Sequence, residues 1–104
     1  MSEENNIQRQ ILEWLKLNHI EAWRNNTGRR GGVSYGKKGL PDIIGYLPDG
    51  RFLGIEVKGK NGILSKEQNE FIKEACINGA YCFVTNSVTD VILELQKYLI
   101  KNDR

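Results

Sequence analysis

The sequence predicts an α/β fold in which a mixed central sheet is flanked by helices, in the order α-β-β-β-α-β-α. Apolar residues at helical spacing mark both ends of the chain, and two apolar strands are joined by Pro48-Asp49-Gly50. A helix then leads to the apolar run at 80–84, and a strand–helix–strand connection of this kind favours parallel pairing. At 104 residues we expect one domain spanning residues 1–104.

The first helix is expected over residues 3 to 18. Ser2 is a suitable N-cap residue, and Glu3 and Glu4 favour the first turn because a helix N-terminus attracts negative charge. Its apolar positions at helical spacing are Ile7, Ile11, Trp14 and Leu15. A short strand is expected over residues 20 to 25, and a basic, glycine-rich segment then forms a long loop.

The second half of the chain begins with a capping-box pattern. Ser65 and Gln68 have the required spacing, and Gly79 suits the left-handed position that follows a helix end. The expected inward stripe of this helix is Phe71, Ile72, Ala75 and Cys76. The continuous apolar run AYCFV, 80–84, predicts a central strand, and Ser87 opens a last helix. The inward positions of that helix are Val91, Ile92, Leu95 and Leu99.

The turn between the two apolar strands determines which residues face one another. Pro48-Asp49-Gly50 fits a type I turn followed by a left-handed glycine, which makes a three-residue loop. Counting outward from that loop places Asp42 opposite Glu56, and side-chain alternation puts Lys58 on the same face. The opposite face is apolar and consists of Ile43, Leu47, Leu53, Ile55 and Val57. A two-residue loop would turn the two carboxylates to opposite faces, so the prediction depends on this turn.

Two carboxylates at opposed strand positions lie about 4.5–5.5 Å apart and repel unless one is protonated or a cation lies between them. Oxygen ligands favour Mg²⁺ or Mn²⁺. The plainer interpretation is that Glu56 and Lys58 form an exposed ion pair and that Asp42 only begins a strand. The lysine and the adjacent basic segment favour the metal site, which predicts metal-assisted hydrolysis of nucleic acid.

Two more polar residues are candidates for the same site. Glu4 shares a helix face with Ile7 and Ile11, although a carboxylate at a helix N-terminus is stabilising by itself. Gln68 heads the inward stripe of the second helix, and either a capping role or a site role explains it.

The segment between Glu21 and Asp42 contains no acidic residue, several cations and five glycines. Such a segment can bind a polyanion, or it can be a solvated, flexible loop. The candidate nucleic-acid-binding residues, which include one lysine after the second hairpin strand, are Arg24, Asn25, Arg29, Arg30, Lys37, Lys38 and Lys60.

The composition favours an intracellular protein. No apolar run reaches the roughly 20 residues of a membrane helix, and the acidic N-terminus is unlike a signal peptide. The two cysteines lie in apolar segments and are expected to be buried free thiols in a reducing compartment. We therefore expect a cytoplasmic location, which is the host cytoplasm if a phage encodes the chain.

Several motifs together resemble a known family. Pro41-Asp42 followed by Glu56-Val57-Lys58 resembles the PD-(D/E)xK nuclease superfamily, and the wider pattern resembles its VRR-NUC (virus-type replication-repair nuclease) branch. The matching segments are Glu4 with Ile7-Gln8, then 23–26, 38–45, 54–58 and 64–68. The resemblance implies a restriction-endonuclease-like core and dependence on Mg²⁺ or Mn²⁺.

The resemblance also implies roles for individual residues. Asp42, Glu56 and the Val57 carbonyl would hold the metal, and Lys58 would be catalytic. Glu4 would be the acidic residue of the first helix, with Glu3 as the alternative, and Gln68 matches a polar position near the site.

Members of this size look like Holliday-junction resolvases that act in DNA repair as homodimers, which predicts a structure-selective endodeoxyribonuclease. Three alternatives remain: a restriction-type endonuclease on the same core, a catalytically silent DNA-binding module, and an adaptor that binds a protein partner and no nucleic acid.

Overall fold

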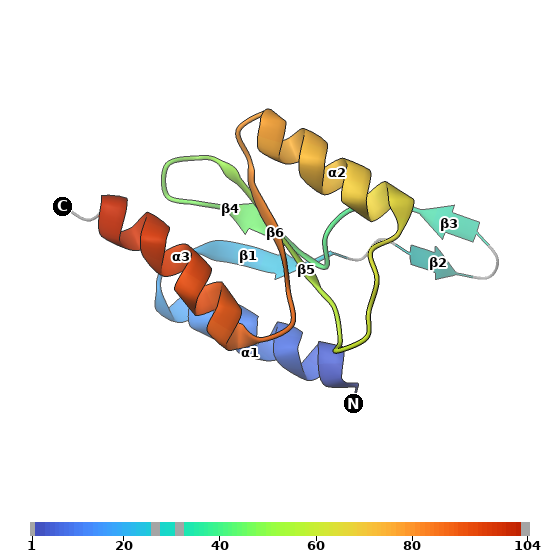
Figure 1. Cartoon of the computed structure of the whole chain (residues 1–104), viewed down its shortest axis with the longest axis horizontal. Coiled ribbons are helices and arrows are strands. Elements are labelled where there is room, and N and C mark those ends of the chain that lie inside the picture. The colour runs from blue at the N-terminus through green and yellow to red at the C-terminus, as the bar shows by residue number, and fades with distance from the viewer. Residues whose placement is uncertain (1, 26–27, 31–32, 103–104) are drawn as a thin grey trace.

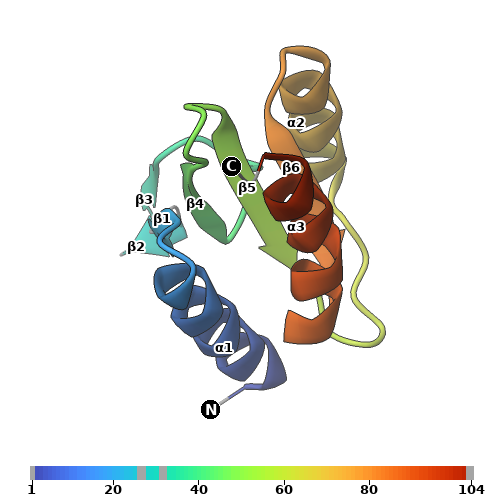
Figure 2. The same cartoon turned by 90° about the vertical axis from the view of Figure 1, so that its left-hand side faces the viewer.

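A four-stranded mixed sheet separates two layers of helices (Figures 1 and 2). This computed structural model describes residues 2–25, 28–30 and 33–102. The strand order is β1 (Glu21–Arg24), β4 (Ile43–Tyr46), β5 (Phe52–Val57) and β6 (Tyr81–Thr85), in which only β5 and β6 pair in parallel. The helices are α1 (Glu3–Leu17), α2 (Lys66–Ile77) and α3 (Val88–Asn102). The predicted α/β fold and its mixed sheet are confirmed, and the predicted order α-β-β-β-α-β-α is that of the three helices and the four strands of this sheet.

One face of the sheet forms the hydrophobic core with α1 and α3. Leu53, Ile55 and Val57 of β5 are fully buried, as is Ile43 of β4. They pack with Ile11 and Leu15 of α1 and with Val91, Leu95 and Tyr98 of α3. Each such side chain contributes roughly 1.5–3 kcal/mol when it leaves water, so this layer holds the sheet and two helices together.

Helix α2 covers the opposite face less completely. Phe71 contacts Phe52 edge-to-face with ring centroids 6.1 Å apart, and the Cys76 thiol donates to the Cys82 carbonyl at 3.3 Å. None of the α2 residues is fully buried, and Cys76 is exposed, so its predicted burial was wrong. The physical reason is that α2 lies toward one edge of the sheet and has no second helix beside it on that face (Figure 1).

The predicted helix ends are close to those observed. The Ser2 hydroxyl accepts from the Asn5 amide at 3.1 Å, and α1 ends one residue earlier than expected, at Leu17. His19 follows it with a left-handed φ of 60°. Gly79 follows α2 with a φ of 97°, as the sequence predicts.

The hairpin between β4 and β5 has the predicted register. The Leu47 amide donates to the Arg51 carbonyl at 2.9 Å, and Gly50 has a φ of 92°, as a three-residue loop requires. Tyr46 lies opposite Phe52 at the turn end of the ladder. At its other end the last pair is Ile43 with Ile55, so Asp42 and Glu56 lie one step beyond the regular pairing.

Two predictions about the strands need correction. The segment expected to be a loop contains a separate antiparallel pair, β2 (Gly28–Arg30) and β3 (Val33–Tyr35). Glycine weakens strand propensity, which hides these short strands in the sequence. The strand at 81–85 is an edge of the described sheet, not a central strand, and it is apolar because helices cover both of its faces.

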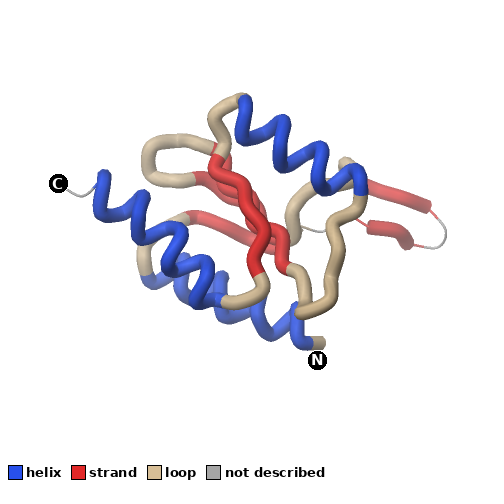
Figure 3. Tube along the Cα trace, viewed as in Figure 1, coloured by secondary structure: helices blue, strands red, loops and turns tan. Residues whose placement is uncertain are grey.

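The irregular segments before β4 and after β5 reach the same end of the sheet (Figure 3). Gly59 follows β5, and its amide donates to Glu4 in the first turn of α1 at 3.0 Å. The N-terminal end of α1 therefore meets this end of the sheet. Among the described residues, no helix is long and apolar enough to cross a membrane.

Candidate functional site

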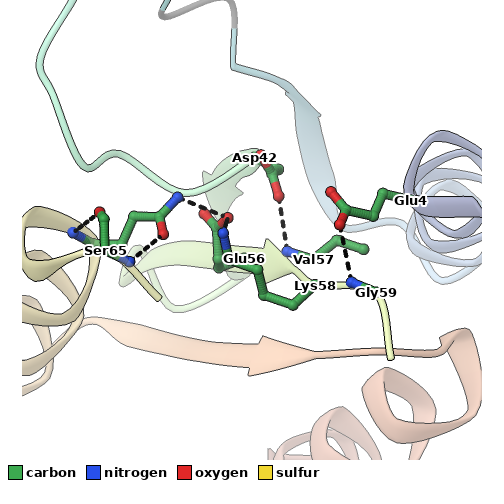
Figure 4. Close-up of polar contacts among 8 residues, drawn as sticks. Glu4, Asp42, Glu56, Val57, Lys58, Gly59 and Ser65 are labelled. Carbon is green, nitrogen blue, oxygen red and sulfur yellow. Dashed lines mark hydrogen bonds and ion pairs between the residues drawn. The ribbon is translucent and has the colours of Figure 1, made fainter. Parts of the chain in front are cut away.

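Asp42 and the end of β5 come together where the β4–β5 ladder stops (Figure 4). One Asp42 carboxylate oxygen, Oδ2, accepts from the Val57 amide at 2.8 Å. The backbone before β4 is held from the other side, because the Asn25 amide donates to the Asp42 carbonyl at 2.8 Å. Asp42 is thus fixed between β1 and β5 by hydrogen bonds to backbone atoms.

Glu56 is a buried carboxylate with one satisfied and one unsatisfied oxygen. Its side chain is only 3% exposed. Oε2 accepts from the Gln68 side-chain amide at 3.1 Å and lies 3.5 Å from the Lys58 Nζ. Oε1 is buried and has no hydrogen-bond partner in the described part of the chain. A buried carboxylate oxygen without a partner is costly, so this position favours a bound cation or proton.

The surroundings of Glu56 disfavour its charged form. Burial, followed by the charge of Asp42 and a hydrogen bond with it, raises the pKa of Glu56 from 4.5 to about 7, and Lys58 only partly offsets this. The two carboxyl groups are therefore close enough to share a proton near neutral pH. A divalent cation would replace that proton and neutralise both groups.

Gln68 forms the predicted capping box and also contacts Glu56. Its backbone amide donates to the Ser65 hydroxyl at 3.1 Å, and its side-chain oxygen accepts from the Ser65 amide at 2.9 Å. The remaining amide nitrogen donates to Glu56. The capping box thus fixes the first turn of α2 and at the same time orients the side chain that holds Glu56.

Lys58 is held by the loop that follows it. Its amide donates to the Thr85 carbonyl at 2.9 Å, and its side chain is 21% exposed. Gly62 folds back onto the lysine, and a Cβ added there would lie 3.0 Å from the Lys58 Cβ and 3.1 Å from its Cδ. Sequence reasoning missed Gly62, and the spacing of two glycines around the Lys60-Asn61 turn was the available signal.

Glu4 reaches the same end of the sheet but bonds to the backbone. Its Oε2 accepts from the Gly59 amide, and Glu3 also lies near Gly59. Residues 2–25, 28–30 and 33–102 contain no group of three or more His, Cys, Asp or Glu side chains that could hold an ion. Asp42 and Glu56 are two neighbouring carboxyl groups at this end of the sheet.

The available donors fit a hard divalent cation. Glu56 Oε1 is free to bind, and Asp42 lies beside it. In an extended strand the carbonyl of a residue points to the same side as its amide, so the Val57 carbonyl would offer a third oxygen on the side of Asp42. Such a set of oxygens suits Mg²⁺ or Mn²⁺ and leaves positions for water.

Comparison with family profiles identifies the class of protein to which the chain belongs. The profile described as the VRR-NUC domain matches residues 2–89. The chain belongs to the VRR-NUC domain family. VRR-NUC domains are a nuclease family, which identifies the chain as a nuclease domain with DNA as its substrate and is in keeping with the use of a divalent metal.

Solved structures have the same fold as this VRR-NUC domain. One, a "VRR_NUC domain", is 24% identical, covers 100% of both chains and has a TM-score of 0.68. Another, a "VRR_NUC domain protein", is also 24% identical, covers 96% of this chain and 90% of its own, and has a TM-score of 0.71. No curated protein matches the chain.

The predicted DNA-binding residues of the VRR-NUC domain lie in different settings. Arg24 donates to the Gln8 side chain at 2.7 Å and to the Asn5 carbonyl at 3.3 Å, so it ties β1 to α1. Lys38 lies 3.8 Å from Glu67 and stays 83% exposed. Lys37 and Lys60 are exposed. Arg29 and Arg30 belong to β2, and their side chains lie outside the described part of the structure.

Proposed function

We propose that this VRR-NUC domain is a divalent-metal-dependent endodeoxyribonuclease that hydrolyses phosphodiester bonds in branched DNA. We further propose that it is a Holliday-junction resolvase of DNA repair, that it acts as a homodimer, and that its site of action is the cytoplasm. The observation that carries the proposal is the pairing of Asp42 with the buried Glu56, which has an unsatisfied oxygen and a lysine beside it.

In the proposed reaction, Asp42, Glu56 and the Val57 carbonyl would hold Mg²⁺ or Mn²⁺. The bound ion supplies a Lewis acid and lowers the pKa of water. Gln68 holds Glu56 Oε2 and leaves Oε1 for the ion. Glu4 fixes the backbone that follows Lys58 by accepting from Gly59.

Lys58 is proposed as the catalytic cation. Its ammonium lies 3.5 Å from Glu56, and the aliphatic part of its side chain packs against Gly62. In this position it can orient the attacking water or stabilise the negative charge that develops on the phosphate oxygens. Because the side chain is only partly exposed, its charge is less screened than that of a surface lysine.

Binding of the DNA backbone is assigned to the cations around the site. Lys37, Lys38 and Lys60 are exposed, and Asn25, Arg29 and Arg30 lie in the same chain segment as the first two. Cations that neutralise phosphates release counterions, so affinity should fall steeply with salt. Symmetric cutting of a four-way junction requires two sites, which a two-fold dimer of this chain would supply.

The test uses a labelled four-way junction and a linear duplex of the same sequence, each with Mg²⁺, Mn²⁺ or EDTA. Junction cutting that EDTA abolishes supports the proposal. Cutting of the linear duplex at fixed sequences would instead indicate a restriction-type endonuclease. Salt-sensitive binding with no cutting in either metal would indicate a catalytically silent DNA-binding module.

A further inference from the structure

Trp23 in the edge strand β1 is a large aromatic side chain that is half exposed. Its exposed fraction is 50%, and that of Tyr46 in the adjacent strand is 51%. Exposed aromatic rings of this kind are characteristic of surfaces that bind another molecule. None of the roles assigned above to the acidic pair, Lys58 or the basic residues involves Trp23.

The strand register places Trp23 beside the acidic pair. Trp23 lies opposite Ile44, and the bond from the Asn25 amide to the Asp42 carbonyl continues that alignment by one more step. Because side chains alternate along strands, Trp23 and Asp42 lie on the same face of the sheet. Diagonal neighbours in such a pair are about 7–8 Å apart, which is about two steps of about 3.4 Å along a stacked nucleic-acid strand.

The position of Trp23 is fixed by its neighbours. Its neighbour Arg24 points to the other face, where it bonds to Gln8 and Asn5 of α1. On the face of Trp23, α2 packs against Phe52 and Cys82, near the far edge of the sheet. The ring is thus held on a rigid strand and half exposed, on the sheet face to which Asp42 also belongs.

The chemistry around Trp23 suits DNA. No acidic residue occurs between Glu21 and Asp42, and the exposed Lys37 and Lys38 lie in this interval. A planar indole next to a phosphate-binding site can stack on a base, and every base has a face suitable for stacking. In a continuous duplex both faces of each base are already stacked on neighbours. Only unpaired bases, strand ends and the pairs bordering a branch point have a free face.

We propose that Trp23 stacks on a nucleobase with an exposed face, about two nucleotides from the phosphate that is cut. This inference rests on the proposed function, and it names the feature of branched DNA that the site recognises. The substrate class is DNA with an unpaired base or a branch point beside the cleavage position. Continuous duplex lacks this contact and binds less tightly.

The first experiment uses tryptophan fluorescence without metal, so that no cleavage occurs. The chain has two tryptophans, and Trp14 packs against the core, so Trp14→Phe leaves Trp23 as the only emitter. The probes are a four-way junction, a duplex with a one-base gap, and a closed duplex, which is a relaxed, covalently closed circle with neither ends nor unpaired bases. We expect the first two to quench the emission and the closed duplex to leave it nearly unchanged. Trp23→Phe, which retains Trp14, is the matched control and should show little change with any probe.

Binding of labelled DNA, followed by anisotropy, supplies the second measurement. Trp23→Ala should lose about 5- to 150-fold in affinity for the junction and little for the closed duplex, and Trp23→Phe should keep most of the preference. Circular dichroism confirms folding, and Trp14→Tyr with selective excitation replaces Trp14→Phe if the latter does not fold.

Three results would overturn the inference. The first is that the junction binds and the Trp23 emission does not change. The second is that the closed duplex quenches the emission as strongly as the junction does. The third is that the emission shifts with protein concentration in the absence of DNA, which would mean that a second copy of the chain covers the ring. These outcomes are separate from the proposed function, because cleavage that needs metal and Asp42 can persist in Trp23→Ala. Conversely, base stacking with no cleavage in Mg²⁺ or Mn²⁺ would remove the nuclease proposal and keep the stacking site.

Discussion

The two faces of β5 differ sharply although they belong to one six-residue strand. On one face, Leu53, Ile55 and Val57 are fully buried among apolar side chains. On the other, Glu56 is almost as deeply buried, yet it has an oxygen without a partner and lies beside a second carboxylate. The first face stabilises the fold, whereas the second retains an unfavourable charge pair, which is typical of a functional site.

The largest effect is expected on the polar face. Asp42→Asn and Glu56→Gln should each lower junction cleavage by about 100-fold or more, because each removes a charged ligand of the proposed metal. Both variants should still fold and still bind the junction. Cleavage and anisotropy assays in Mg²⁺ measure the two properties separately, and full activity in either variant would contradict the metal assignment.

The opposite outcome is expected on the apolar face. Ile55 is fully buried, so Ile55→Ala should lower the free energy of unfolding by about 2–5 kcal/mol. Urea denaturation measures this loss. The folded fraction should retain its cleavage rate per molecule, and a selective loss of cleavage without loss of stability would show that the two faces are not separable.

The pH dependence of stability should reveal the charge on Glu56. Its pKa is raised from 4.5 to about 7, so between these values the folded, metal-free protein holds more protons than the unfolded chain. Stability should therefore fall as pH rises through this window and level off above it. Urea titrations in EDTA at several pH values measure the slope. Glu56→Gln is the control and should flatten this part of the profile.

Gln68 connects the two kinds of role, and Ser65 provides a matched control. Ser65→Ala removes one bond of the capping box and should cost about 0.5–2 kcal/mol in stability, with little change in cleavage. Gln68→Ala also removes the contact with Glu56 and should lower cleavage in addition. Equal cleavage by the two variants would mean that Gln68 only caps the helix.

The smallest effect is expected at Gly62. An alanine there would press on Lys58, so Gly62→Ala should lower the cleavage rate about tenfold or less and leave DNA binding unchanged. Gly79→Ala is a useful control, because it strains the backbone at a φ of 97° and has open space around its Cβ. That control should lose stability and keep cleavage, and a matching loss of cleavage in both would argue against a specific role for Gly62.

The parts of the molecule that sequence predicts well are those encoded by neighbouring residues. Pro48-Asp49-Gly50 determines the turn locally, and the turn then determines the hairpin register that brings Asp42 toward Glu56. The capping box at Ser65 is local in the same way. The core face followed from alternation of apolar residues alone.

Features that depend on contacts between distant segments were less predictable. The placement of Gly62 against Lys58 depends on the path of a loop, which no periodicity encodes. The sequence also could not show that Arg24 is engaged by α1, because both residues it contacts lie at least 16 positions away. The edge position of β6 was missed because coverage by helices makes edge and central strands equally apolar.

The three-residue turn at Pro48–Gly50 lies at the end of the hairpin remote from the acidic pair. Inserting or deleting one residue there would shift the pairing of the two strands by one position. Asp42 would then point to the sheet face opposite that of Glu56 and Lys58, although all three residues would still be present. In a lineage of such proteins, the length of this loop should consequently be under as strong selection as the acids themselves, even though it lies at the far end of the hairpin from them.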